Sequence, residues 1–323
     1  MDRNLNHTMK TMTRRDFLKL SGAGATLTGL GAFAPRFASA IEPIQRSGPA
    51  KLRLSLAAYS FRDFFKDASY ARKTQADPAK QIDMMQFIDY CADQGCEGAE
   101  LTSYYFPKDV TDDYLRQVRA HASKRGVAVS GTSVGNTFTL PKSEKRDQQI
   151  ADVKKWVDRA AVMGAPHIRV FAGSVPKGGN AEEATRLCIE AMEECCDYAG
   201  KKRIYLGIEN HGGIVAEPEG LLEIIRAVKN PWCGVNLDTG NFHSDDPYAD
   251  LVKCAPYSVN VQVKVEMKRK SAKQNEPADL VRIVKMLRDV SYQGFVALEY
   301  ESKEDPYTAV PRVLKEMKAA FKK

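Results

Sequence analysis

Hydrophobic and polar positions follow two different patterns along this chain. Short apolar runs of strand character recur eight times, at 52–58, 97–101, 127–132, 167–172, 204–209, 233–238, 258–264 and 294–299. Between them lie longer stretches with apolar residues three and four positions apart, the spacing of amphipathic helices. These predicted helices cover 80–93, 111–125, 145–163, 181–199, 219–229, 247–254, 277–289 and 306–321.

Eight strands that alternate with eight helices predict parallel strands joined by helical crossovers. A single closed (β/α)8 TIM barrel over residues 41–323 is the simplest architecture, and this length lies within the usual range for that fold. A doubly wound open sheet is the alternative. It would favour a G-x-G-x-x-G turn after the first strand, and the chain has none there.

The first 40 residues have a different character and predict an export signal. Arg14 and Arg15 precede "DFLKL", a weakly apolar run follows over 20–34, and "ASA" stands at 38–40. A charged start, a short apolar stretch and a small-x-small site are typical of a cleaved signal peptide. The arginine pair resembles a twin-arginine signal, so we expect a periplasmic or otherwise exported protein that begins near Ile41.

Charge, hydrophobicity and cysteine content limit the classes of binding partner that we expect. Removing residues 1–40 lowers the formal charge from +7 to 42 − 39 = +3, and "KRKSAK" at 268–273 reads as a solvated loop, so we expect no nucleic-acid partner. No later segment approaches 18 uncharged apolar residues, so we expect no membrane contact beyond the signal. The seven cysteines lack metal-site spacing and receive no chemical role here, and the sequence leaves their disulfide state and a homo-oligomer open.

Three predicted strands end on a carboxylate. "IYLGIE" ends at Glu209, "CGVNLD" at Asp238 and "GFVALE" at Glu299, while Gln262 and Lys264 share one side of the seventh strand by the two-residue period. In a parallel barrel these ends meet at one rim, where active sites of this fold lie.

Carboxylates that converge without a cation repel one another and raise each other's pKa. A bound divalent metal removes this conflict. Oxygen ligands from two glutamates, an aspartate and an amide favour a hard cation, so the sequence predicts Mn²⁺ or Mg²⁺ at this rim. The predicted ligands are Glu209, Asp238, Gln262 and Glu299.

Four motifs in order, "GIENHGG", "NLDTGN", "VQVKVE" and "ALEYE", resemble the sugar phosphate isomerase/epimerase superfamily of xylose-isomerase-like TIM barrels. The upstream runs "GAELTSYYFP" and "GAPHIRVFAG" resemble exported members, and the resemblance covers about 52–320. In ketose 3-epimerases of this group, Glu, Asp, His and Glu hold the metal. Here the resemblance implies Glu209, Asp238, Gln262 and Glu299, with Gln262 in place of the histidine.

The resemblance also implies the chemistry. Glu209 and Glu299 would flank a bound sugar, one removing and one returning a proton beside the carbonyl, through an enediolate that the metal stabilises. In those epimerases a substrate-binding histidine stands three residues after the metal aspartate. This chain has Asn241 there.

Other polar residues near the strand ends are candidates for substrate contact. His211 follows Glu209 by two positions, and Lys264 points into the mouth beside Gln262 as an electrostatic aid. Glu100 ends the second strand and Arg169 lies within the fourth. For Glu100 and Arg169 a buried ion pair is the alternative interpretation.

Three functions stay open at this point. The first is an isomerase or epimerase acting on a small carbohydrate. The second is a 3-keto-glycoside lyase, in which the same proton abstraction ends in β-elimination. The third is a sugar-binding barrel without activity, with Gln262 and Asn241 as signs of lost catalysis.

Overall fold

The computed structural model describes residues 42–67 and 77–323, which belong to one compact unit. The predicted signal at 1–40 lies outside the described residues. None of the helices in the described ranges combines the length and apolar composition that a membrane crossing requires.

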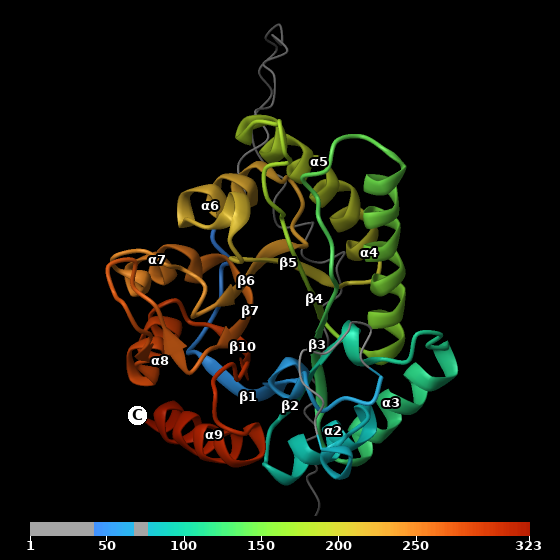
Figure 1. Cartoon of the computed structure of the whole chain (residues 1–323), viewed down its shortest axis with the longest axis vertical. Helices are drawn as coiled ribbons and strands as arrows, with labels where there is room; N and C mark the ends of the chain where they lie inside the picture. Colours follow the sequence, from blue (N-terminus) through green and yellow to red (C-terminus); the bar gives the residue numbers. More distant parts are fainter. Residues whose placement is uncertain (1–41, 68–76) are drawn as a thin grey trace, which may run out of the picture. The chain divides into compact units, whose positions relative to one another are not determined.

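Eight parallel strands close into a barrel, which confirms the predicted fold (Figure 1). The strand order around the wall is β1-β10-β7-β6-β5-β4-β3-β2. The barrel strands are β1 (Lys51–Ala57), β2 (Gly98–Thr102), β3 (Ala128–Ser133), β4 (His167–Val170), β5 (Tyr205–Glu209), β6 (Cys233–Asp238), β7 (Ser258–Val263) and β10 (Gln293–Leu298).

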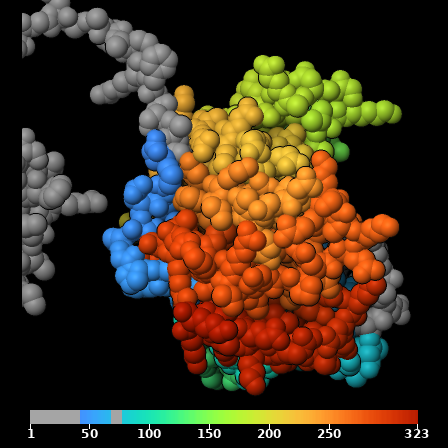
Figure 2. All heavy atoms as spheres, turned by 90° about the vertical axis from the view of Figure 1, so that its left-hand side faces the viewer, coloured from blue at the N-terminus to red at the C-terminus, as the bar shows by residue number. Residues whose placement is uncertain are grey.

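Eight helices surround this wall, as the spacing of apolar residues predicts. They are α2 (Met84–Asp93), α3 (Asp112–Lys124), α4 (Glu144–Met163), α5 (Ala181–Gly200), α6 (Pro218–Ala227), α7 (Pro247–Cys254), α8 (Leu280–Asp289) and α9 (Pro306–Lys322). Viewed from the left of Figure 1, α7, α8 and α9 cover the outside of the barrel (Figure 2). Their buried faces are apolar, with Leu251, Leu287 and Leu314 at 0–1% exposure.

The helix ends follow local chemistry. The first helix begins at Met84, four residues later than predicted, because Asp83 and Gln86 form a reciprocal capping box at its start. The α4 helix ends at Met163 and is capped by Gly164, whose φ of +79° is accessible to glycine at little cost. These caps place the helix starts and stops, and with them the loops above the barrel.

One element departs from the prediction. The segment after β7 holds an antiparallel hairpin of β8 (Glu266–Met267) and β9 (Glu276–Pro277), with Glu266 paired to Pro277. The sequence indicated only a solvated loop at 268–273. The hairpin strands are two residues long, too short to show a two-residue apolar period.

The barrel axis carries polar side chains where this fold usually packs branched apolar ones. The Oγ atoms of Ser55 and Ser130 lie 2.7 Å apart, while Leu54 and Leu56 face the hydrophobic core outside the wall. Higher along the axis, Glu100 receives amide hydrogen bonds from two residues of β7 on the far side of the barrel. All seven cysteines are buried free thiols.

Candidate active site at the barrel mouth

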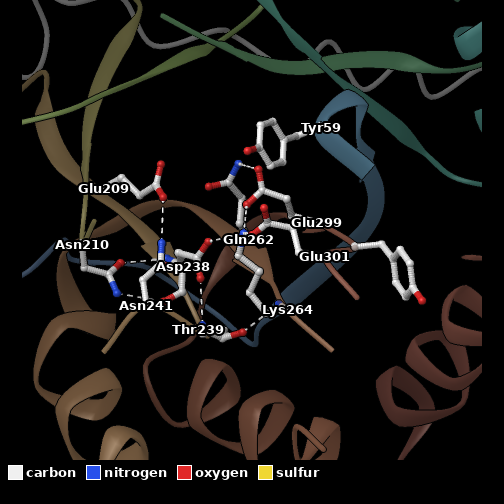
Figure 3. A network of polar contacts seen from close by, with 12 residues as sticks. Tyr59, Glu209, Asn210, Asp238, Thr239, Asn241, Gln262, Lys264, Glu299 and Glu301 are labelled. Atoms are coloured by element: carbon white, nitrogen blue, oxygen red, sulfur yellow. Dashed lines mark hydrogen bonds and ion pairs between the residues drawn. The ribbon is translucent and has the colours of Figure 1, made fainter. Parts of the chain in front are cut away.

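The strand-end residues meet at one rim (Figure 3). Glu209 and Asp238 are the last residues of β5 and β6, and Glu299 and Lys264 come directly after β10 and β7. Asp238 is paired in register with Gln262 of the neighbouring strand. The parallel barrel thus brings together side chains that lie up to 90 positions apart in the sequence.

Lys264 lies in the middle of this group. Its ammonium Nζ is 2.7 Å from Glu299 Oε2 and 3.3 Å from Asp238 Oδ2, and it also pairs with Glu301. The side chain is 8% exposed, and its Nζ lies 5.8 Å from the centre of the Tyr59 ring. A buried ammonium surrounded by three carboxylates is strongly held in its charged form.

The Asp-Thr-Gly turn after β6 shapes the rim. The backbone N–H of Gly240 donates to Asp238 Oδ1 at 2.8 Å, which holds the carboxylate in a fixed orientation. A Cβ at position 240 would lie 2.5 Å from Cγ of Lys264, so only glycine lets the lysine stem pass. The turn therefore serves both the carboxylate and the ammonium beside it.

A side-chain amide fixes β5 against β6 at the same level. Asn210 donates from Nδ2 to the Asp238 carbonyl and accepts the Asp238 N–H, both at 2.9 Å. Asn210 is fully buried, so these two bonds replace backbone pairing where the strands diverge. The residue directly after the Glu209 carboxylate thus positions the Asp238 carboxylate.

Glu209 is held from two sides. Its Oε2 lies 2.8 Å from Arg169 Nε, and its Oε1 accepts from Asn241 Nδ2 at 2.9 Å. Burial raises the pKa of Glu209 above its ordinary value, although the Arg169 charge opposes this. Arg169 and Asn241, both predicted to bind substrate, here contact a catalytic candidate.

Glu299 has a different electrostatic environment. Burial by itself would raise its pKa, but the Lys264 ammonium more than offsets this and lowers the pKa below its ordinary value. Burial raises the pKa of Asp238 well above its usual range, because its Lys264 contact is longer and its neighbours are acidic. The pKa of Glu209 is therefore raised while that of Glu299, at the same rim, is lowered.

Glu100 and Gln262 lie below the mouth in a fully hydrogen-bonded network. Gln262 Nε2 donates to Glu100 Oε1 at 2.6 Å, and Asn260 Nδ2 donates to Glu100 Oε2 at 2.8 Å. The Gln262 carbonyl oxygen accepts from Asn236 Nδ2 at 2.5 Å. Burial and the nearby Glu299 charge raise the pKa of Glu100 to about 7.

This network determines what Gln262 offers to the mouth. The amide NH₂ of Gln262 turns toward Glu100, and its carbonyl oxygen turns toward Asn236. The amide nitrogen, not the oxygen, is 3.5 Å from Glu299 Oε1. The predicted ligand role of Gln262 requires the opposite amide orientation and stays a prediction, as does contact of the fully buried Glu100 with substrate.

A cavity of about 340 Å³ lies between the segments that follow β5 and β6, and we call it the mouth cavity. Its lining residues are His211, Gly212, Ala216, Glu217, Asn241 and His243. His211 is exposed, and its ring packs on Phe171 with centroids 4.7 Å apart. A ligand in this cavity would meet His211 and Asn241 directly, and the contact of these two residues with substrate stays a prediction.

The donor set at the rim fits a hard divalent cation in its chemistry. The carboxylates of Glu209, Asp238, Glu299 and Glu301 outnumber the cations Arg169 and Lys264, and the buried Asp238 Oδ2 makes no hydrogen bond although Lys264 Nζ lies 3.3 Å away. In the present arrangement, however, no three His, Cys, Asp or Glu side chains of the described residues converge tightly enough for a metal site. Lys264 Nζ takes the central place.

Comparison with known proteins identifies the family. Residues 88–317, more than two thirds of the chain, match the xylose isomerase-like TIM barrel family. The chain belongs to this family. No curated protein matches the sequence.

Solved structures with this barrel superpose over most of the chain. D-psicose 3-epimerase from Clostridium cellulolyticum H10 is 14% identical, with a TM-score of 0.64 over 84% of this chain and 97% of the other. The 3-keto-D-glucoside 4-epimerase of E. coli is 14% identical, with a TM-score of 0.64 over 84% and 99%. A xylose isomerase-like TIM barrel protein from Mycobacterium smegmatis in complex with magnesium is 19% identical, with a TM-score of 0.63 over 83% and 97%. At these identities the likeness shows the xylose isomerase-like fold alone.

Several residues of this barrel's site escaped the sequence analysis. They are Asn210, Asn236, Asn260 and Glu301. For three of them the sequence held a usable signal, the two-residue period of a strand. Asn236 and Asn260 stand two positions before Asp238 and Gln262 inside apolar strands, and Glu301 stands two positions after Glu299, so the two-residue period places each on the same side as a predicted site residue.

Proposed function

We propose that this protein is a sugar isomerase or epimerase that moves a proton at the carbon next to a sugar carbonyl. The observation that carries the proposal is the pair Glu209 and Glu299. They stand at the ends of β5 and β10, separated in the barrel wall by β6 and β7, with Lys264 and Arg169 as their charged partners. Two buried carboxyls whose environments differ are suited to separate acid and base roles.

The proposed reaction is an enolisation followed by reprotonation. One glutamate takes the proton from carbon, the C–H electron pair forms the C=C bond of an enediol, and the carbonyl oxygen gains negative charge. The other glutamate returns a proton to carbon, on the opposite face for an epimerase. Lys264 supplies positive charge beside Glu299, where this oxygen charge would develop.

The remaining side chains would bind and orient. Asn241 and Arg169 fix the Glu209 carboxylate, and the exposed His211 in the mouth cavity is placed to hydrogen-bond a sugar hydroxyl. The burial of Glu209 and Glu299, at 3% and 5% exposure, keeps bulk water from the proton-transfer groups. A small carbohydrate is the substrate class that fits these polar partners.

We further propose that Mn²⁺ or Mg²⁺ is the cofactor, held by Glu209, Asp238 and Glu299, with Gln262 as the fourth predicted ligand. When bound, the ion would supply Lewis-acid stabilisation of the enediolate charge. Its entry requires Lys264 to leave the position that it takes among these carboxylates. Two of the similar structures are named as sugar epimerases and one as a magnesium complex, which supports the proposed sugar chemistry and cofactor.

Deuterium exchange tests this function. Purified protein is incubated in D₂O with Mn²⁺ and a panel of free ketoses and 3-keto-glycosides, and the products are followed by NMR. We expect deuterium at the carbon beside the carbonyl, with the glycosidic bond intact. Glu209→Gln and Glu299→Gln should each lower kcat by about 10²–10⁴-fold with a smaller change in KM, because shape is kept and the base is lost.

The same experiment separates the alternatives. Release of the aglycone together with exchange would support the 3-keto-glycoside lyase instead. Binding of sugars without any exchange would support the barrel without activity. Equal exchange by wild type and both glutamine variants would reject Glu209 and Glu299 as the proton-transfer pair.

A further inference from the structure

The β8–β9 hairpin follows β7 and is tethered to the segment after β10. Glu266 of β8 accepts from Ser302 Oγ at 2.6 Å and from Asn275 Nδ2 at 2.8 Å. These two hydrogen bonds lower the pKa of Glu266 and keep it a carboxylate. The hairpin, which is an addition to the eight-stranded barrel, is thereby fixed to the loop that follows Glu299.

The hairpin forms one wall of a second cavity, of about 660 Å³, which we call the hairpin cavity. The other walls come from Arg62 after β1 and from residues 301–303 after β10, while Gln274 and Asn275 line the hairpin side. Glu301 belongs to this lining and pairs with Lys264, which in turn contacts Glu299. We call Lys264 and the carboxylates of Asp238, Glu299 and Glu301 the charged centre. The hairpin cavity adjoins this centre through Glu301. The mouth cavity lies near it through Asn241, which hydrogen-bonds Glu209.

Arg62 is a fixed polar group of this cavity. Its Nη1 donates to the carbonyls of Tyr300 at 3.1 Å and Tyr59 at 3.4 Å, and its guanidinium lies 5.2 Å from the Tyr59 ring centre. The same ring lies 5.8 Å from Lys264 Nζ. Tyr59 thus links the charged centre to the hairpin cavity through a surface that can stack on a sugar ring.

We propose that the hairpin cavity binds the second unit of a glycoside whose reacting sugar lies between Glu209 and Glu299, an inference that rests on the proposed function. The mouth cavity has about half the volume of the hairpin cavity, and 660 Å³ is the size of a complete small-molecule pocket. Two cations, Arg62 and Lys303, balance the two carboxylates of the lining, and amide and hydroxyl groups complete it. This mixture suits the hydroxyl groups of a neutral sugar and disfavours a phosphorylated one.

The test compares two substrates with the same reacting ring. One is a 3-keto-disaccharide and the other the corresponding methyl 3-keto-glycoside, each followed by deuterium exchange. We expect wild type to favour the disaccharide by about tenfold or more in kcat/KM. Gln274→Trp fills the cavity from an exposed hairpin position and should reduce this preference about tenfold. Lys177→Trp, at an exposed position after β4 that lines neither cavity, should leave the preference unchanged.

Each outcome decides the inference. Equal kcat/KM for the two substrates in wild type, or an unchanged preference in Gln274→Trp, would overturn it. If neither substrate exchanges, the deuterium assay with free ketoses decides the proposed function, and calorimetric titration of the same two ligands decides the subsite separately. Tighter binding of the disaccharide that Gln274→Trp abolishes would retain the second-unit site, and equal affinity would reject it.

Discussion

The ammonium group of Lys264 is surrounded by Asp238, Glu299 and Glu301 at the barrel mouth. Two buried carboxylates without a cation would cost several kcal/mol of folding free energy, so the lysine stabilises the site whenever no metal is bound. A lysine and a divalent ion that share the same carboxylates must compete. The residue is therefore both a structural counter-charge and a limit on metal affinity.

A substitution of Lys264 tests this dual role. In EDTA, Lys264→Met should lose about 3–5 kcal/mol in the free energy of unfolding, because Asp238 and Glu299 stay buried without their partner. Mn²⁺ should restore part of this loss and bind more tightly than to wild type. Urea denaturation with and without Mn²⁺ and calorimetric titration measure both effects.

A matched control exists on the surface. Lys285 pairs with Asp289 at 2.6 Å along α8, with both side chains exposed, so Lys285→Met should change stability and metal affinity little. If Lys264→Met were as stable as wild type in EDTA and bound Mn²⁺ no more tightly, Lys264 would not be the counter-charge of this site.

At the scale of elements, the loops after β4 and β5 are fastened to each other beside the mouth cavity. The N–H of Ile214 donates to the carbonyl of Gly173 at 3.0 Å. Gly213, with a φ of +58°, lies so close that a Cβ there would be 2.2 Å from the same carbonyl oxygen. The preceding glycine, Gly212, has a φ of +64°, and a Cβ there would meet no atom within 4 Å.

These two glycines provide a matched pair of substitutions. Gly212→Ala should cost only its backbone strain, about 1–3 kcal/mol, because a φ of +64° with a ψ of −158° is nearly restricted to glycine. Gly213→Ala should add to the strain of its own positive φ the displacement of the Gly173 loop, typically a further 1–3 kcal/mol. Urea denaturation of both variants gives the difference. Equal losses would show that the loop contact does not constrain the backbone near His211.

At the scale of the whole molecule, the twin-arginine signal over residues 1–40 stays a prediction. The described barrel belongs to a compact unit of its own, which suits a route that exports folded proteins. We expect the exported form to begin near Ile41 and the double substitution Arg14→Lys/Arg15→Lys to hold the protein in the cytoplasm. N-terminal sequencing and cell fractionation measure this, with Arg36→Lys as the control that should still be exported. Equal export of the double variant would contradict the twin-arginine assignment.

The sequence alone determined the order of the elements and the rim where the site lies. The strands observed at β1, β5, β6 and β10 begin and end within a residue of the predicted runs, because apolar periodicity and glycine or capping residues act over a few positions. The carboxyl ends of parallel strands share one rim, so Glu209, Asp238 and Glu299 could be grouped from their strand-end positions.

Only the tertiary structure decided how those side chains share charge and hydrogen bonds. Glu100 of β2 orients the Gln262 amide from 162 positions away, and Arg169 of β4 pairs with Glu209 rather than facing an open cavity. Lys264 takes the centre, and the hairpin cavity arises where three loops meet. These arrangements depend on barrel closure and on distances of a few ångströms between remote residues, which no local pattern in the chain encodes.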